Sequence, residues 1–238
     1  MPAEVSPSAV PSEASHSVEL AGLLSELSAR LLGADDLGQG LDRLAAFAAG
    51  ALPGVLRCSV VLIADGGPPA RAASGTRGQT LDDLQYTSGL GPALDAARAR
   101  TTVTVRDLTA DDRWPELAEC ARTDGVHAMA ALSLDVHRSS VGALSLFVAE
   151  PGGVGPDLLL TAMAIVNQAQ VLLAELRRRE YRVENPAVDR AAGVIIAQRG
   201  CGVQEAYDVL QETAHRLGLD RTTVAERLIA AAARNAGT

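Results

Sequence analysis

The chain lacks lysine entirely, and its positive charge comes from 21 arginines spread over 238 residues. Cysteine is also scarce: Cys58, Cys120 and Cys201 show no C-x-x-C spacing, and three cysteines cannot all pair within one chain. Isolated cysteines of this kind are typical of reduced thiols in a reducing cytosol. The sequence therefore argues against a disulfide framework and against a cysteine-based metal site.

Long apolar runs are missing as well. No run reaches the roughly 20 residues needed to cross a bilayer, and no lysine or arginine precedes Arg30, as a secretory signal would require. We therefore expect a cytoplasmic protein without a membrane contact. Aromatic residues make up only 3% of the chain, but 47% of it is hydrophobic, which is enough for a packed core.

Catalytic motifs are absent too, since the sequence contains no G-x-S-x-G, no Walker A and no H-E-x-x-H. The run from Gly89 to Pro92 looks like a phosphate-binding loop, but its proline removes a backbone donor. His127 and His137 are the candidates for a haem ligand, yet a lone histidine beside a turn is more often a surface residue. The sequence predicts a protein that is not an enzyme and holds no cofactor.

Charge divides the chain into two parts. Residues 1–176 carry a formal net charge of −10, whereas residues 177–238 carry +2. A small basic segment behind an acidic one is typical of an output module that contacts a polyanion.

The first part begins with a segment poor in large apolar side chains. Residues 1–17 mix proline, serine and acids, so we predict a disordered tail. Leucine spacing then predicts helices over 18–32 and 37–52. The β-branched run 58–64, followed by Asp-Gly-Gly, predicts a buried strand that turns into a hairpin.

The middle of the chain is less regular. It predicts a short strand over 103–105, a helix over 113–123, and strands over 129–136 and 141–148 joined by a four-residue connection. This order predicts an α+β domain over residues 18–156, with an antiparallel sheet and helices on one side.

The longest predicted helix follows over residues 157–184 and closes the domain. Residues along it recur at spacings of three and four, which is a heptad pattern: Ala162, Ile165, Ala169, Leu172, Leu176, Arg179 and Val183. Such a seam favours a homodimer held by a coiled coil, although a helix packed on its own sheet would show the same spacing.

Residues 185–238 predict a small domain of three helices. Asn185 is expected to cap the first helix, which ends at the glycines around position 201. The second helix covers 203–217 and stops at Gly218, and the spacing from Thr223 to Glu226 predicts a capping box for the third.

Several motifs of residues 18–176 resemble the GAF sensory domains of actinobacterial regulators. They are Leu84-Gln85-Tyr86, Gly89-Leu90-Gly91-Pro92, Val105-Arg106-Asp107-Leu108, Arg113-Trp114-Pro115, Gly125-Val126 and Val141-Gly142-Ala143-Leu144. The resemblance implies a GAF-like sheet whose pocket accepts an unidentified small ligand. The pattern of the cyclic-nucleotide version is missing, and Ala93 stands where many relatives have a cysteine. Trp114 could close the pocket, but a core position is more usual for a large ring.

The basic segment, over about 184–231, resembles the ANTAR domain, the RNA-binding output of transcription antitermination regulators. The matching residues are Ala191-Ala192-Gly193, Ile195, Gly202, Glu205-Ala206-Tyr207, Leu210 and Val224-Ala225. The family usually has a lysine where this chain has Ala192.

The two resemblances together imply a signal-responsive antitermination regulator whose partner is an RNA hairpin. Arginines would contact phosphates, and polar side chains would contact splayed bases. The candidate RNA-binding residues are Arg190, Gln198, Arg199, His215, Arg216 and Arg221.

A DNA-binding helix-turn-helix is the alternative. The spacing of Ala214, Gly218 and Val224 suits that motif, and Arg221 would then begin the recognition helix. A net charge of only +2, with acids close to that helix, favours RNA over DNA.

Overall fold

The structure is a computed structural model that describes residues 13–64, 69–137, 140–183 and 186–236. The chain divides into two compact units, residues 1–176 and 177–238. We describe each unit by itself.

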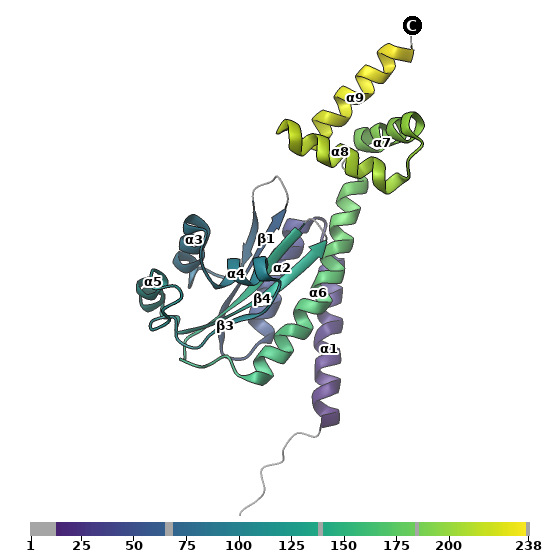
Figure 1. Cartoon of the computed structure of the whole chain (residues 1–238). Coiled ribbons are helices and arrows are strands. Elements are labelled where there is room, and N and C mark those ends of the chain that lie inside the picture. Colours follow the sequence, from purple (N-terminus) through teal and green to yellow (C-terminus); the bar gives the residue numbers. More distant parts are fainter. Residues whose placement is uncertain (1–12, 65–68, 138–139, 184–185, 237–238) are drawn as a thin grey trace, which may run out of the picture. The chain divides into compact units, whose positions relative to one another are not determined.

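The first unit is built on an antiparallel sheet of five strands in the order β2-β1-β5-β4-β3 (Figure 1). The strands are β1 (Val55–Ala64), β2 (Ala70–Ala73), β3 (Val103–Val105), β4 (Ala128–His137) and β5 (Ser140–Val148). β1 and β2 form the predicted hairpin, and so do β4 and β5. The α+β class and the antiparallel sheet are confirmed.

Helices cover both faces of this sheet (Figure 1). One face carries α1 (Glu13–Leu32), α2 (Leu37–Ala51) and α6 (Pro156–Val183), and the other carries α3 (Gln79–Ser88), α4 (Pro92–Ala99) and α5 (Leu117–Asp124). Side chains alternate along a strand, so Val60 joins the core under α2 and α6 while Val61 joins the core under α4. The prediction of helices on one side was therefore wrong, because apolar periodicity did not reveal α3 and α4.

Some boundaries also differ from the predictions. α1 begins at Glu13, within the expected tail, and β1 begins at Val55. α5 begins only at Leu117, because Trp114 and its neighbours form turns in which the Leu117 N–H donates to the Trp114 carbonyl. The Trp114 ring is buried in the core and serves as packing, while the Arg113 guanidinium lies over it.

α6 is the central helix of the first unit. Its predicted heptad residues Ala162, Ile165 and Ala169 are fully buried in the core shared with α1, α2 and the sheet. These three residues therefore pack within their own unit, the alternative that the spacing left open, whereas Arg179 is exposed and the side chain of Val183 lies outside the described residues. By length and hydropathy, Pro156–Arg179 could also cross a membrane, contrary to the expectation from the sequence. Its inner face nonetheless packs in the protein core.

The second unit contains α7 (Pro186–Arg199), α8 (Val203–Leu217) and α9 (Arg221–Ala236), as predicted. Its core consists of small and branched side chains: Val188, Ala191, Ala192, Ile195, Ala206, Leu210, Ala214, Val224 and Ala225. α9 is capped by Asp220 and not by Thr223, because the Thr223 N–H donates to the Asp220 carboxylate at 2.9 Å. The predicted cap Asn185 lies outside the described residues.

We expect Gly142 in β5 to tolerate no side chain. A Cβ placed there would lie 2.0 Å from the carbonyl oxygen of Val61 in β1, so the strands would have to separate. Gly142→Ala should lower the free energy of unfolding by about 2–4 kcal/mol, measured by urea denaturation. Gly50→Ala in α2 is the control: a Cβ there meets nothing within 4 Å, and this variant should be neutral or slightly stabilised. Equal stability of the two variants would contradict the expectation.

Candidate nucleic-acid interface and sensory site

The six predicted RNA-binding residues all lie in the second unit. Arg190, Gln198 and Arg199 are exposed on α7, and His215 and Arg216 are exposed in the last turn of α8. Arg221, the first residue of α9, is half-exposed.

These residues form two groups, separated by the length of α8. Gln198 and Arg199 precede the turn into α8, whereas His215, Arg216 and Arg221 flank the turn out of it. A helix of 15 residues is about 22 Å long. A single RNA would therefore have to extend along α8 to contact both groups.

A hydrogen bond joins α7 and α8. The Tyr207 hydroxyl in α8 donates to the Asp189 carboxylate in α7, and this bond raises the pKa of Tyr207. The positive charge of Arg221 acts on the same pKa in the opposite direction.

The exposed face of α7 has a gap at Gly193, which the sequence analysis did not identify as a site. Gly193 is exposed in the middle of the helix, and a Cβ there would meet nothing within 4 Å. A glycine inside a helix costs about 1 kcal/mol relative to alanine, and packing within the chain gives no reason for it here. The gap leaves the α7 backbone open one turn after Arg190, on the same side of the helix.

Ala192, next to Gly193, faces the interior of the second unit. It is 3% exposed and belongs to the three-helix core. The position where the sequence lacks the expected lysine is thus a packing position in this chain. A long charged side chain at Ala192 would have to leave the core to reach solvent.

The first unit contains a second group of polar side chains, buried between the sheet and α3. Arg57 on β1 and Asp82 on α3 form an ion pair at 2.7 Å with both side chains buried. The Arg57 Nε donates to the Gly75 carbonyl, and its guanidinium lies 5.1 Å from the centre of the Phe147 ring. The Ser59 hydroxyl donates to the other oxygen of Asp82 at 3.1 Å.

Burial is the largest cause of the pKa shift of Asp82. Desolvation raises the pKa of Asp82, and the neighbouring Arg57 and Ser59 partly oppose the shift. Desolvation also raises the pKa of the nearby Tyr86 hydroxyl beyond its ordinary range. Since breaking a buried pair leaves one charge uncompensated, Arg57 and Asp82 hold β1 and α3 together.

Gln85, one turn after Asp82 on α3, is held in one orientation. Its Oε1 accepts from the Ala93 N–H at 3.0 Å, and Gly91, with φ +140°, leaves it room. A Cβ at Gly91 would lie 2.3 Å from the Gln85 side chain.

Several polar atoms of this site have no partner within the described residues. They are Arg57 Nη1, Gln85 Nε2 and Ser145 Oγ, all buried. Ser145 is the cross-strand neighbour of Ser59, whose hydroxyl donates to Asp82. A buried donor without an acceptor is costly.

The sequence analysis did not identify this site. Two signals were available: Arg57 and Ser59 two residues apart in the mainly apolar strand 55–64, and Asp82 and Gln85 three apart on one face of a helix. The histidines give no comparable site. His127 Nδ1 lies 3.8 Å from the half-exposed Asp107 carboxylate, and the side chain of His137 is outside the described residues.

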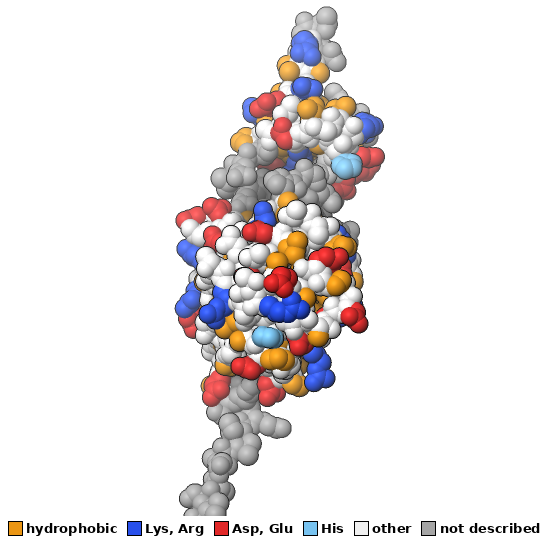
Figure 2. All heavy atoms as spheres, turned by 90° about the vertical axis from the view of Figure 1, so that its left-hand side faces the viewer, with side chains coloured by type: hydrophobic (Ala, Val, Ile, Leu, Met, Phe, Trp, Pro, Cys, Tyr) orange, Lys and Arg blue, Asp and Glu red, His pale blue; other side chains and the backbone are white. Residues whose placement is uncertain are grey.

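The surface of this unit mixes acidic and basic side chains on the face in view (Figure 2).

The chain thus combines an α+β unit with a small unit of three helices. Comparison with known families identifies the second one: residues 178–229 match the ANTAR domain. The chain therefore contains an ANTAR domain.

Solved structures identify the fold of the first unit. The GAF domain of a phosphoenolpyruvate-protein phosphotransferase from Coxiella burnetii superposes with a TM-score of 0.52 and 18% identity, over 69% of this chain and 96% of that one. The N-acylhomoserine lactone dependent LuxR family factor CepR2 from Burkholderia cenocepacia gives 0.53 and 15%, over 68% and 99%. Free methionine-R-sulfoxide reductase from Neisseria meningitidis gives 0.50 and 14%, over 74% and 98%. The first unit thus has the GAF fold. No curated protein sequence matches the chain.

The Asp220 cap makes the stability of the ANTAR domain depend on pH. Thr223 donates two hydrogen bonds to the Asp220 carboxylate, which lower its pKa. Because the folded-state pKa is lowered, the contribution of the cap is complete above the ordinary aspartate value of about 3.9 and is lost as the pH falls through the folded value.

Asp220→Asn keeps an acceptor oxygen but cannot titrate. Its melting temperature, followed by circular dichroism, should therefore fall less than that of the wild type between about pH 5 and pH 3. An identical fall in both proteins would show that the cap does not contribute.

Proposed function

We propose that the protein is a cytoplasmic, signal-responsive transcription antitermination regulator without enzymatic activity, which acts as a homodimer. In this proposal the ANTAR domain binds an RNA hairpin and the GAF-fold unit receives the signal. The single observation that carries it is the match of residues 178–229 to the ANTAR domain, on a unit that is net basic while the rest of the chain is acidic.

The surface of the ANTAR domain supports RNA as the partner. Arg190 and Gln198 are exposed on α7, and the Gly193 gap lies one turn after Arg190 on the same side of the helix. Exposed arginines can contact phosphates, and a gap free of side chains can admit a base or the sugar-phosphate backbone.

A helix-turn-helix that binds DNA remains the competing function. Gly218 has φ +62° in the turn between α8 and α9, and Ala214 and Val224 on either side of it are buried, as that motif requires. However, the exposed Glu226 lies within the supposed recognition helix, where DNA phosphates would repel it.

Binding of the full chain to an RNA hairpin and to duplex DNA of equal charge tests the proposal. We expect tighter binding to the hairpin by fluorescence anisotropy. Arg199→Ala should weaken hairpin binding by about 1 kcal/mol, roughly fivefold, and reduce the salt slope by about 1.

Arg122→Ala is the matched control, because Arg122 is an exposed arginine on α5 of the other unit. It should leave hairpin affinity unchanged. Equal or tighter binding to duplex DNA would overturn the RNA proposal, and equal losses in the two variants would remove Arg199 from the interface.

For the signal, we propose a small ligand that presents acceptor oxygens to Arg57 Nη1 and Gln85 Nε2. The support is the group of buried polar atoms around the Arg57–Asp82 pair. The similar protein CepR2 depends on an N-acylhomoserine lactone, and the similar free methionine-R-sulfoxide reductase was solved with its substrate. Both agree with a small-molecule ligand.

Native mass spectrometry of the full chain purified from its own cells tests this ligand. We expect an added mass on the wild type that is lost in Gln85→Met, which removes the donor at similar volume. Ser88→Ala, on the same helix but with a hydroxyl that bonds only locally, should retain it. An unmodified wild-type mass, or an added mass that persists in Gln85→Met, would contradict the proposal.

A further inference from the structure

The positive charge of the second unit is concentrated at its start. Three consecutive residues there, Arg177, Arg178 and Arg179, carry a formal charge of +3. Residues 180–238 hold seven arginines and eight acids, so they carry −1. The net charge of +2 over residues 177–238 therefore comes from the end of α6 and not from the helices α7, α8 and α9. We call residues 177–179 the arginine run.

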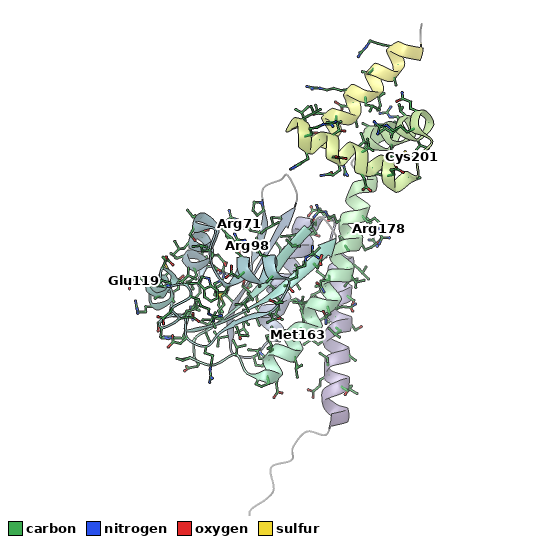
Figure 3. The ribbon with its side chains drawn as sticks, viewed as in Figure 1. Arg71, Arg98, Glu119, Met163, Arg178 and Cys201 are labelled. Atoms are coloured by element: carbon green, nitrogen blue, oxygen red, sulfur yellow. The ribbon has the colours of Figure 1, made fainter. Side chains whose placement is uncertain are left out.

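The arginine run is accessible on the surface. Arg178 and Arg179 are exposed and Arg177 is partly buried; Figure 3 labels Arg178 on α6. With 3.6 residues in each turn of a helix, Arg178 and Arg179 point to two adjacent sides of α6. A guanidinium is always charged and presents several donors to a phosphate, so the two side chains can contact separate phosphates.

The stability of α6 does not explain three cations in a row. Basic residues stabilise a helix through its dipole only within the last turn, and α6 ends at Val183, after the arginine run. Glu175 precedes Arg178 by three residues and Arg179 by four. Exposed ion pairs at this spacing contribute little, so neither effect requires the run.

The arginine run is close enough along the chain to share one RNA with α7. Seven residues lead from Arg179 to Pro186, the first residue of α7, and they span at most about 25 Å when extended. A nucleic-acid duplex carries on the order of one phosphate charge for every 2 Å of its axis. A stem of that length thus presents on the order of ten phosphates within reach of the run.

An anionic lipid surface is the other polyanion that a basic run could contact. Lipid-binding clusters typically contain about four to eight basic residues, which is more than the arginine run provides. In addition, Arg178 and Arg179 lie within residues 178–229, which match the ANTAR domain. These two observations favour RNA as the partner.

We propose that the arginine run of α6 is a phosphate anchor for the RNA hairpin, and that it adds affinity without preference for the loop sequence. This inference rests on the RNA binding in the proposed function and adds a contact outside α7, α8 and α9. Leu176, the residue before the run, is buried in the core of the first unit. The anchor is therefore attached directly to that core.

Fluorescence anisotropy of the full chain, with hairpins that share one stem and differ in the loop, tests the anchor. The double variant Arg178→Gln with Arg179→Gln should bind every hairpin more weakly by one common factor, on the order of tenfold at 0.1 M salt, and its salt slope should fall by about 2. Both side chains are exposed and glutamine is a good helix former, so the circular dichroism spectrum should not change.

Arg227→Gln with Arg234→Gln is the matched control. Both arginines are exposed on α9, neither is among the proposed RNA-binding residues, and the pair changes the net charge by the same amount. This control should keep the affinity and the salt slope of the wild type.

Unchanged hairpin affinity in the Arg178→Gln, Arg179→Gln variant, equal losses in the control, or losses that depend on the loop would overturn the anchor and leave the proposed function intact. If the wild type binds duplex DNA as tightly as the hairpins and the variant loses both, only the RNA proposal fails. A wild type that binds neither nucleic acid would overturn both. Sedimentation with phosphatidylserine vesicles tests the lipid alternative: vesicle binding that the variant loses, with hairpin affinity unchanged, would assign the run to a membrane surface.

Discussion

The packing of α6 against the sheet and α2 is the contact on which the first unit depends. At Gly40 of α2 a Cβ would lie 2.8 Å from the side chain of Leu176 and 3.0 Å from that of Leu173. The two helices therefore approach closely at Gly40, where a side chain would require these leucine side chains to shift, and the leucines of α6 belong to the core that the sheet shares with α2. Because this inner face is used completely within the unit, any contact with another molecule has to use the remaining sides of the helix.

The two faces of the sheet are packed with different kinds of side chain. The face under α1, α2 and α6 is closed by aliphatic side chains, whereas the face under α3 and α4 contains the Arg57–Asp82 pair and Gln85. Aliphatic packing is non-directional and stabilises the fold. Buried polar groups are directional, and they stabilise only when every partner is present. The second face is thus the one that contains buried polar atoms without a partner among the described residues.

Much of this fold could be predicted from the sequence, since strong periodicity marks α2, α6 and the hairpin strands. The two missed helices have weaker patterns: α3 buries Asp82 and Gln85 in its interior-facing side, which a search for apolar spacing cannot find. Ala162, Ile165 and Ala169 of the predicted α6 heptad are all buried, but spacing alone does not distinguish a core from an interface.

For the candidate site, the sequence located the exposed arginines of the ANTAR domain. The burial of Ala192 and the opening at Gly193 could not be predicted in this way, because they depend on how α7 packs against α8 and α9.

The three cysteines have a practical consequence. Cys58 is buried, and burial raises the pKa of its thiol to about 12, so it will not react with alkylating dyes in the folded protein. Cys120 and Cys201 are partly exposed, one in the GAF-fold unit and the other between α7 and α8 of the ANTAR domain (Figure 3). The natural chain thus carries one thiol for a fluorophore or spin label in each unit, and the separation between the two units can be followed in solution without engineered attachment sites.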